Sequence, residues 1–125
     1  MIVGTGIDIV EVPRLAATLE RFGDRFLKRV FTAAEIRYCD SKMNRAERYA
    51  ARFAAKEAGL KAIGTGLRNG ISWRELEVSR EPGGRPTLAL HGKAASYAAN
   101  LGARRTSLSL SHTAQHAIAQ VILED

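Results

Sequence analysis

Glu57 and Lys61 are two side chains of opposite charge in the alanine-rich stretch FAAKEAGLKA, which covers residues 53–62. Their spacing of four residues places them on one face of a helix, where a solvated ion pair contributes only about 0.2–0.5 kcal/mol. Both border the apolar stripe that the same helix would form with Tyr49, Phe53 and Leu60. The pair is therefore either an ordinary surface salt bridge or part of a cleft where the helix meets a sheet.

A third ionisable side chain, Asp8, interrupts the apolar stretch from Ile2 to Val12, which we predict to be a buried strand. An ionised carboxylate in such a strand is costly unless it is paired, hydrogen-bonded or bound to a metal ion. A backbone N–H group or an arginine would satisfy Asp8. Alternatively, Asp8 and Glu57 together would suit Mg²⁺, which prefers one or two carboxylates combined with phosphate oxygens and water. This second hypothesis predicts phosphoryl chemistry.

Basic side chains on the other flank of the same helix favour a phosphate ligand. They follow one another at spacings of three and four residues, and they are Arg45, Arg48, Arg52 and Lys56. Arginine and lysine at such spacings can hold phosphate groups, although a row of this kind is also ordinary on a solvated helix surface. The row alone therefore does not decide between a phosphate-binding site and an ordinary solvated helix surface.

His112 follows the alternating stretch SLSLS and precedes Thr113. No cysteine or further carboxylate lies at zinc-ligand spacing from it, so the sequence predicts no zinc site. A histidine at a strand end is usually structural, but beside a phosphate it could donate a hydrogen bond. The chain has neither a Walker loop nor a GxSxG or GxGxxG motif.

The elements that must position these residues form a single α+β domain over residues 1–125, in which an antiparallel sheet packs on a long central helix. The expected strands are 2–12, 73–79, 87–90, 106–111 and 117–123, and EPGGRP (81–86) would turn the second into the third. The expected helices are 13–22, 26–30, 32–40, 45–63 and 93–101. Thr32 and Glu35 have capping-box spacing, and Gly64 would end the long helix.

The overall charge favours acidic partners, because 19 Lys and Arg against 13 Asp and Glu give a net charge of +6. The single cysteine, Cys39, cannot form an internal disulfide, and the N-terminal stretch shows no export or membrane signal, so we expect a cytoplasmic protein. A nucleic-acid-binding module would also be basic, but Asp8 and Glu57 would repel phosphates without a metal ion, and the aromatic residues form no stacking platform. A non-catalytic trimeric scaffold would leave the charged motif unexplained.

Taken together, these segments resemble a known family. The stretches GIDIVEVPRL, FTAAEIRYC, RFAAKEAGLKAIGTG, GRP and SLSHTAQHAIAQVILE are similar, in order and spacing, to the small bacterial holo-acyl-carrier-protein synthases, which are 4′-phosphopantetheinyl transferases. The resemblance spans nearly the whole chain. It implies transfer of the 4′-phosphopantetheine arm from coenzyme A to a serine of apo-acyl carrier protein, with release of adenosine 3′,5′-bisphosphate, in support of fatty acid biosynthesis.

The resemblance also implies roles for individual residues. Asp8 and Glu57 match the Mg²⁺ ligands, and Glu57, or a metal-bound water that it orients, would take the serine proton. Lys61 matches a lysine that contacts the same phosphates and assists the leaving group. The residues expected around the coenzyme are Arg45, Arg48, Arg52, Lys56, Thr65, Gly66, Pro86, His112 and Thr113.

Members of this family dock the acidic carrier protein on a basic first helix and assemble as homotrimers that bind coenzyme A at the subunit boundary. By resemblance, the docking residues here are Arg14, Arg21, Phe22, Arg25, Phe26 and Lys28, of which Arg25 and Lys28 would extend the basic row if the helix continues past Gly23. The expected partners are thus the carrier protein, coenzyme A and two further copies of the chain. Neither nucleic acid nor a membrane is expected.

Overall fold

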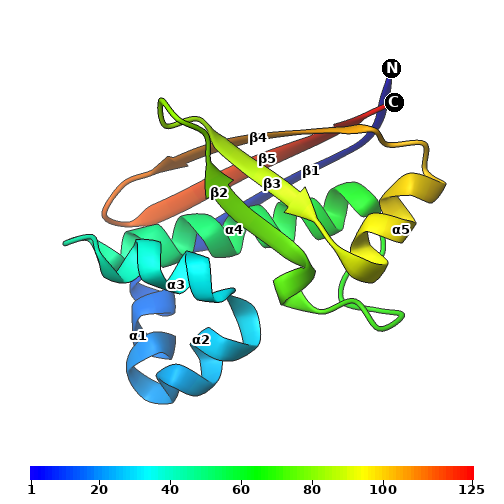
Figure 1. Cartoon of the computed structure of the whole chain (residues 1–125). Coiled ribbons are helices and arrows are strands. Elements are labelled where there is room, and N and C mark those ends of the chain that lie inside the picture. Colours follow the sequence, from blue (N-terminus) through cyan, green and yellow to red (C-terminus); the bar gives the residue numbers. More distant parts are fainter.

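The long helix α4 (Arg45–Ile63) is the element on which the rest of the chain packs (Figure 1). The computed structural model describes all residues from 1 to 125. The other helices are α1 (Val12–Phe22), α2 (Asp24–Val30), α3 (Ala33–Asp40) and α5 (Gly92–Asn100), with a 3-10 turn η1 (Trp73–Glu75). The strands are β1 (Ile2–Glu11), β2 (Leu76–Arg80), β3 (Pro86–Leu90), β4 (Arg105–His112) and β5 (His116–Glu124). The predicted α+β class and the bounds of the long helix are confirmed.

The helix ends follow the predicted signals. Gly64 adopts a left-handed conformation with φ 88° and donates its N–H to the Leu60 carbonyl at 2.9 Å, which closes α4. Thr32 and Glu35 form the complete capping box that begins α3. Gly23, with φ 52°, separates α1 from α2. The first helix therefore does not continue past Gly23, and the docking residues predicted on it lie on two helices.

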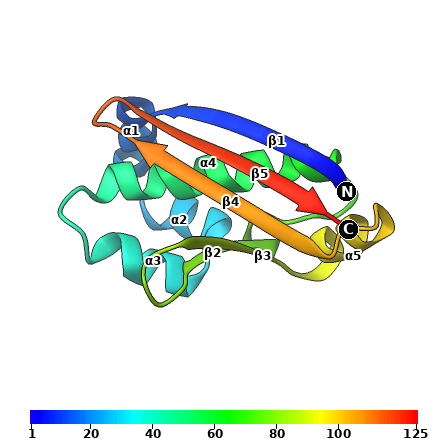
Figure 2. The ribbon, with the colours of Figure 1, turned by 90° about the horizontal axis from the view of Figure 1, so that it is seen from above.

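The main sheet is antiparallel, with strand order β1-β5-β4, and one of its faces packs directly on α4 (Figure 2). Gly4 and Gly6 make this contact possible, because a Cβ atom at either position would collide with the backbone of α4, at Ala62 and Ala58 respectively. Alternate residues of a strand share a face. Asp8 therefore continues the Gly4–Gly6 face and points toward the helix.

The opposite face of the same sheet is not covered by any helix (Figure 2). Ile7, Ile9 and Ile118 lie on it with exposed fractions of 56%, 63% and 39%, and Ile9 pairs directly with Ile118 across β1 and β5. Serines of the outer face of β4 flank these isoleucines. The prediction of a buried first strand is therefore wrong for one of its two faces.

The second sheet is the predicted hairpin, in which β2 pairs with β3. Its first strand begins later than expected, because Trp73 to Glu75 form the 3-10 turn η1. Ser72 caps this turn by accepting the Arg74 N–H and by donating its own N–H to the Glu75 carboxylate at 3.0 Å. The hairpin crosses α4 beside the main sheet, with β3 next to β4 (Figure 1).

Candidate active site

Asp8, Glu57 and Lys61 meet where β1 crosses the second half of α4. The Lys61 ammonium donates to the Asp8 carboxylate at 3.1 Å and to the Ile7 carbonyl at 3.0 Å. Asp8 is thus satisfied by a lysine and not by the backbone N–H or arginine considered from the sequence. The expected ion pair between Glu57 and Lys61 is absent, because the ammonium of Lys61 lies against the strand instead.

These three side chains line a cavity of about 560 Å³ between β1, α1, α2 and α4. Arg14 lies at its edge, and Phe26 and Phe53, whose ring centroids are 6.1 Å apart, form an aromatic wall. Glu57 is half-buried. Burial and the nearby charge of Asp8 raise the pKa of Glu57 above its ordinary value, and Lys61 only partly offsets them. The cavity therefore combines two facing carboxylates with a cation and an apolar wall.

A second group of cations gathers around Tyr38 of α3. The guanidinium carbons of Arg52 and Arg80 lie 4.1 and 5.5 Å from the ring centroid, and the Lys42 ammonium lies 5.1 Å from it. Burial alone would raise the pKa of Tyr38, but Arg80, Arg52, Arg48 and Lys42 leave it below its ordinary value. None of these four cations forms an ion pair with a carboxylate, and the buried Nε of Arg52 has no hydrogen-bond partner. Such a cluster suits an anionic ligand.

The four basic side chains predicted to bind phosphate do not lie together in the structure. Lys56 in particular is not part of the Tyr38 cluster. Its side chain is fully buried, with its ammonium 2.8 Å from the Glu35 carboxylate, so it cannot reach a phosphate in solvent. The prediction is wrong because α3 and β2, which are distant in sequence, cover this flank of α4. Arg45 is exposed but pairs with Asp40 at 2.7 Å, so of the four only Arg48 and Arg52 belong to the Tyr38 cluster.

The remaining residues expected around the coenzyme lie far apart in one chain. Thr65 and Gly66 follow the C-terminal end of α4. His112 lies beside the first turn of the same helix, where its Nδ1 is 3.0 Å from the Glu47 carboxylate, and Thr113 is next to it. A helix of 19 residues is about 28 Å long. Pro86 begins β3, in the separate hairpin. A single chain therefore does not bring this set together.

The predicted docking residues form an exposed surface on α1 and α2. Arg14, Arg21, Arg25 and Lys28 are exposed, and Phe22, 47% exposed, lies under the Arg21 guanidinium at 5.1 Å. Phe26 is half-buried because its ring packs on Phe31 and Phe53 and lines the cavity. The surface thus leads from solvent to the edge of the cavity.

Comparison with known families agrees with this geometry. A family model described as the 4′-phosphopantetheinyl transferase superfamily matches residues 4–121. The chain belongs to the 4′-phosphopantetheinyl transferase superfamily.

Relatives within this superfamily match over the whole chain. The holo-[acyl-carrier-protein] synthase of Koribacter versatilis is 68% identical over 125 residues, which is all of both chains. The crystal structure of the Neisseria meningitidis synthase superposes with a TM-score of 0.90 at 33% identity and covers all of both chains. The Helicobacter pylori synthase, solved in complex with coenzyme A, has a TM-score of 0.84 at 32% identity and covers 96% of this chain and 99% of its own.

Four residues of this transferase fold matter to the two polar clusters but were not singled out for that role from the sequence. Tyr38, Arg80 and Lys42 complete the cationic group, and Glu35 pairs with Lys56. Glu35 was recognised only as a helix-capping residue, which accounts for one of its carboxylate oxygens. The stretch FTAAEIRYC contains both Glu35 and Tyr38, so the signal was present without an assignment.

Proposed function

We propose that this chain is a holo-[acyl-carrier-protein] synthase, which transfers the 4′-phosphopantetheine group from coenzyme A to a serine of apo-acyl carrier protein. The observation that carries the proposal is the convergence of Asp8, Glu57 and Lys61 on one cavity in a chain whose full-length relatives are such synthases. The product would enter fatty acid biosynthesis, and adenosine 3′,5′-bisphosphate would leave.

The two carboxylates of the cavity fit a bound Mg²⁺ ion. Asp8 and Glu57 face each other closely enough for the charge of Asp8 to raise the pKa of Glu57, so a divalent cation between them would relieve a repulsion that Lys61 does not remove. No cluster of three or more His, Cys, Asp or Glu side chains is present that could hold a metal ion alone. Two carboxylates leave room for phosphate oxygens and water, as Mg²⁺ prefers. When bound, the ion would neutralise charge on the pyrophosphate.

The reaction forms a bond between the serine Oγ and the β-phosphorus of coenzyme A and breaks the bond from that phosphorus to the bridging oxygen. Glu57, or a water that it orients, would accept the serine proton. Lys61, half-exposed and four residues further on, lies against Asp8 in the free chain and would turn its ammonium toward the phosphate that leaves.

The 3′-phosphate of coenzyme A fits the cations around Tyr38. Arg48, Arg80 and Lys42 have no carboxylate partner and reach the surface, whereas Arg52 is only 2% exposed and would contribute its charge from beside the Tyr38 ring. Thr65, Gly66, Pro86, His112 and Thr113 remain proposed contacts. Because they are spread along α4 and the hairpin, they would serve one coenzyme only if a neighbouring copy of the chain supplied some of them.

We further propose the homotrimer and the cytoplasmic location. The uncovered face of the main sheet supports self-association, because an interface between copies of the chain would bury the exposed Ile7, Ile9 and Ile118. Of the helices only α4 reaches 18 residues, and its charged side chains make it unfit to cross a bilayer. Native mass spectrometry of the wild type and of Ile9→Lys tests the assembly: the wild type should be trimeric and the variant monomeric.

An acidic carrier protein would dock on the exposed cations of α1 and α2, with Phe22 as the apolar centre. Arg14→Glu and Arg21→Glu should each raise KM for the carrier protein, more strongly at low salt. Arg104→Glu, a charge reversal beside β4, is the matched control and should leave KM unchanged. Equal effects of all three would place docking elsewhere.

The transferase activity is tested by intact mass spectrometry of an apo-acyl carrier protein incubated with the chain, coenzyme A and Mg²⁺. A mass gain of one phosphopantetheine is expected, and it should disappear with EDTA and with Glu57→Gln. Glu20→Gln, which neutralises an exposed glutamate on α1, should leave the gain unchanged. Absence of a gain with several carrier proteins would refute the proposed function, and nucleic-acid binding would be tested next.

A further inference from the structure

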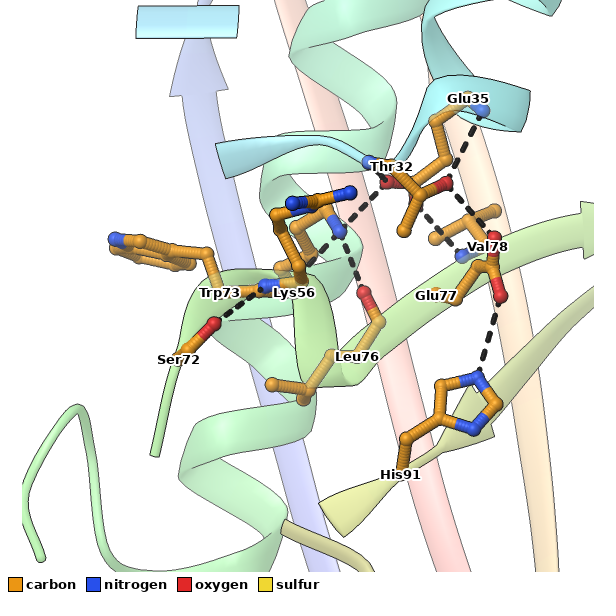
Figure 3. A network of polar contacts seen from close by, with 10 residues as sticks. Thr32, Glu35, Lys56, Ser72, Trp73, Leu76, Glu77, Val78 and His91 are labelled. Atoms are coloured by element: carbon orange, nitrogen blue, oxygen red, sulfur yellow. Dashed lines mark hydrogen bonds and ion pairs between the residues drawn. The ribbon is translucent and has the colours of Figure 1, made fainter. Parts of the chain in front are cut away.

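Lys56 and Glu35 form the centre of a polar network inside the molecule, beside α4 (Figure 3). Both side chains have an exposed fraction of 0%. The Lys56 ammonium contacts a Glu35 oxygen at 2.8 Å and donates to the carbonyls of Leu76 at 2.5 Å and Trp73 at 3.3 Å. An ammonium has three N–H donors, so Lys56 is saturated.

Glu35 accepts three hydrogen bonds through its two carboxylate oxygens. One carboxylate oxygen accepts the Thr32 N–H and the Lys56 ammonium, both at 2.8 Å, and the other accepts the Val78 N–H at 2.8 Å. The network continues through Thr32 to Glu77 and ends at the half-exposed His91 (Figure 3). The pair therefore joins four elements at fixed directions, namely α3, α4, η1 and β2.

The network touches the cavity at two points. Lys56 directly precedes Glu57, so the backbone that presents the Glu57 carboxylate is held one residue away. The Trp73 carbonyl is bound by Lys56, while the Trp73 ring packs on Phe53 with centroids 5.1 Å apart, and Phe53 belongs to the aromatic wall. A shift of η1 would therefore move the wall.

Burial of this pair is costly, and apolar residues of similar volume could fill the same space without loss of stability. Directional hydrogen bonds fix the angle between α4 and the elements beside it, which apolar packing alone does not do. We propose that Lys56 and Glu35 are positioning residues for the transfer reaction, which hold Glu57 and the aromatic wall in register. This inference rests on the proposed function.

The decisive variant is Glu35→Gln combined with Lys56→Met, because neither single change alone keeps the buried charges balanced. The double variant removes both charges and keeps a similar volume. Because one amide oxygen replaces two carboxylate oxygens, either the Thr32 N–H or the Val78 N–H loses its acceptor. We expect it to fold, with kcat reduced at least tenfold and KM for coenzyme A changed less than threefold. Leu108→Ala, a truncation of a buried side chain on β4, is the control that lowers the melting temperature but should keep kcat.

A second readout does not depend on activity. Trp73 is the only tryptophan, so its emission maximum and its quenching by acrylamide report the position of η1 directly. Both should change in the double variant and stay unchanged in Leu108→Ala. A folded double variant with wild-type kcat, or with wild-type Trp73 emission and quenching, overturns the proposal. If the wild type itself is inactive, the proposed function fails, and the emission and quenching still decide whether the pair positions η1.

Discussion

Two lysine–carboxylate pairs lie on opposite sides of α4, and they differ in almost everything except their chemistry. Lys61 and Asp8 are 3.1 Å apart, with side chains 54% and 16% exposed, and Glu57 beside them has no partner. Lys56 and Glu35 are 2.8 Å apart and fully buried, and each also bonds to two backbone groups. The open pair retains capacity to bind a ligand, whereas the closed pair has none. Spare hydrogen-bonding capacity, and not charge, separates the candidate catalytic lysine from the structural one.

The largest effect is expected at the open side. Glu57→Gln should reduce kcat at least about a thousandfold, because it removes a proposed metal ligand and base together. Its melting temperature should not fall, since the change removes a charge that burial and Asp8 already disfavour. Activity assays and thermal unfolding of the same preparation measure both. A stable variant with near-wild-type kcat would remove Glu57 from the chemistry.

The closed side should respond in stability. Glu35→Ala leaves the Lys56 ammonium buried without its counterion, and it should lower the free energy of unfolding by about 3–5 kcal/mol. Asp8→Ala, which frees the half-exposed Lys61, should cost no more than about 1 kcal/mol. Urea unfolding of both variants measures the difference. Equal losses would mean that burial does not distinguish the two pairs.

The Tyr38 cluster should respond less strongly than either lysine–carboxylate pair, because its cations have no carboxylate partner. Arg80→Gln should raise KM for coenzyme A about fivefold, as expected for one lost charge-assisted hydrogen bond. KM for dephospho-coenzyme A, which lacks the 3′-phosphate, should not change. The same substitution should raise the pKa of Tyr38 toward its ordinary value, since Arg80 is the leading cause that lowers it. A parallel rise in both KM values would place the 3′-phosphate elsewhere.

The smallest effect concerns pH and the unpaired Glu57. Its pKa is raised in the folded chain, so the folded state holds the proton more tightly than the unfolded state, where the value is near 4.5. Stability contributed by Glu57 is therefore lost as pH rises from about 4.5 through the folded-state pKa. The difference in unfolding free energy between wild type and Glu57→Gln should shift in favour of the variant over this range. Chemical denaturation at several pH values, without Mg²⁺, tests the sign.

Local signals predicted much of this fold. The bounds of α4, the Thr32–Glu35 capping box and the β2–β3 hairpin were predicted from alanine content, cap residues and the EPGGRP turn, all of which act over a few residues. Asp8 was recognised because a carboxylate in an apolar strand is costly. These features depend on neighbours in sequence.

The errors all involve neighbours that are distant in sequence. The helical spacing along α4 predicted that Lys56 lies beside Arg52 on the surface. In the structure, α3 and β2 cover the lysine, and its ammonium pairs with Glu35 of α3. The first strand was expected to be buried because its apolar side chains lie on both faces, yet only one face meets α4. Neither the burial of a flank nor the covering of a sheet face can be obtained from one element alone.

The glycines of the GTGID segment have a consequence for anyone who redesigns this cavity. Gly4 and Gly6 let β1 touch the backbone of α4, and that contact sets how far Asp8 stands from Glu57. A single methyl group at residue 6 would act as a spacer that pushes the strand outward and widens the gap between the two carboxylates. The spacing of the two carboxylates thus depends on a pair of residues that have no side chain.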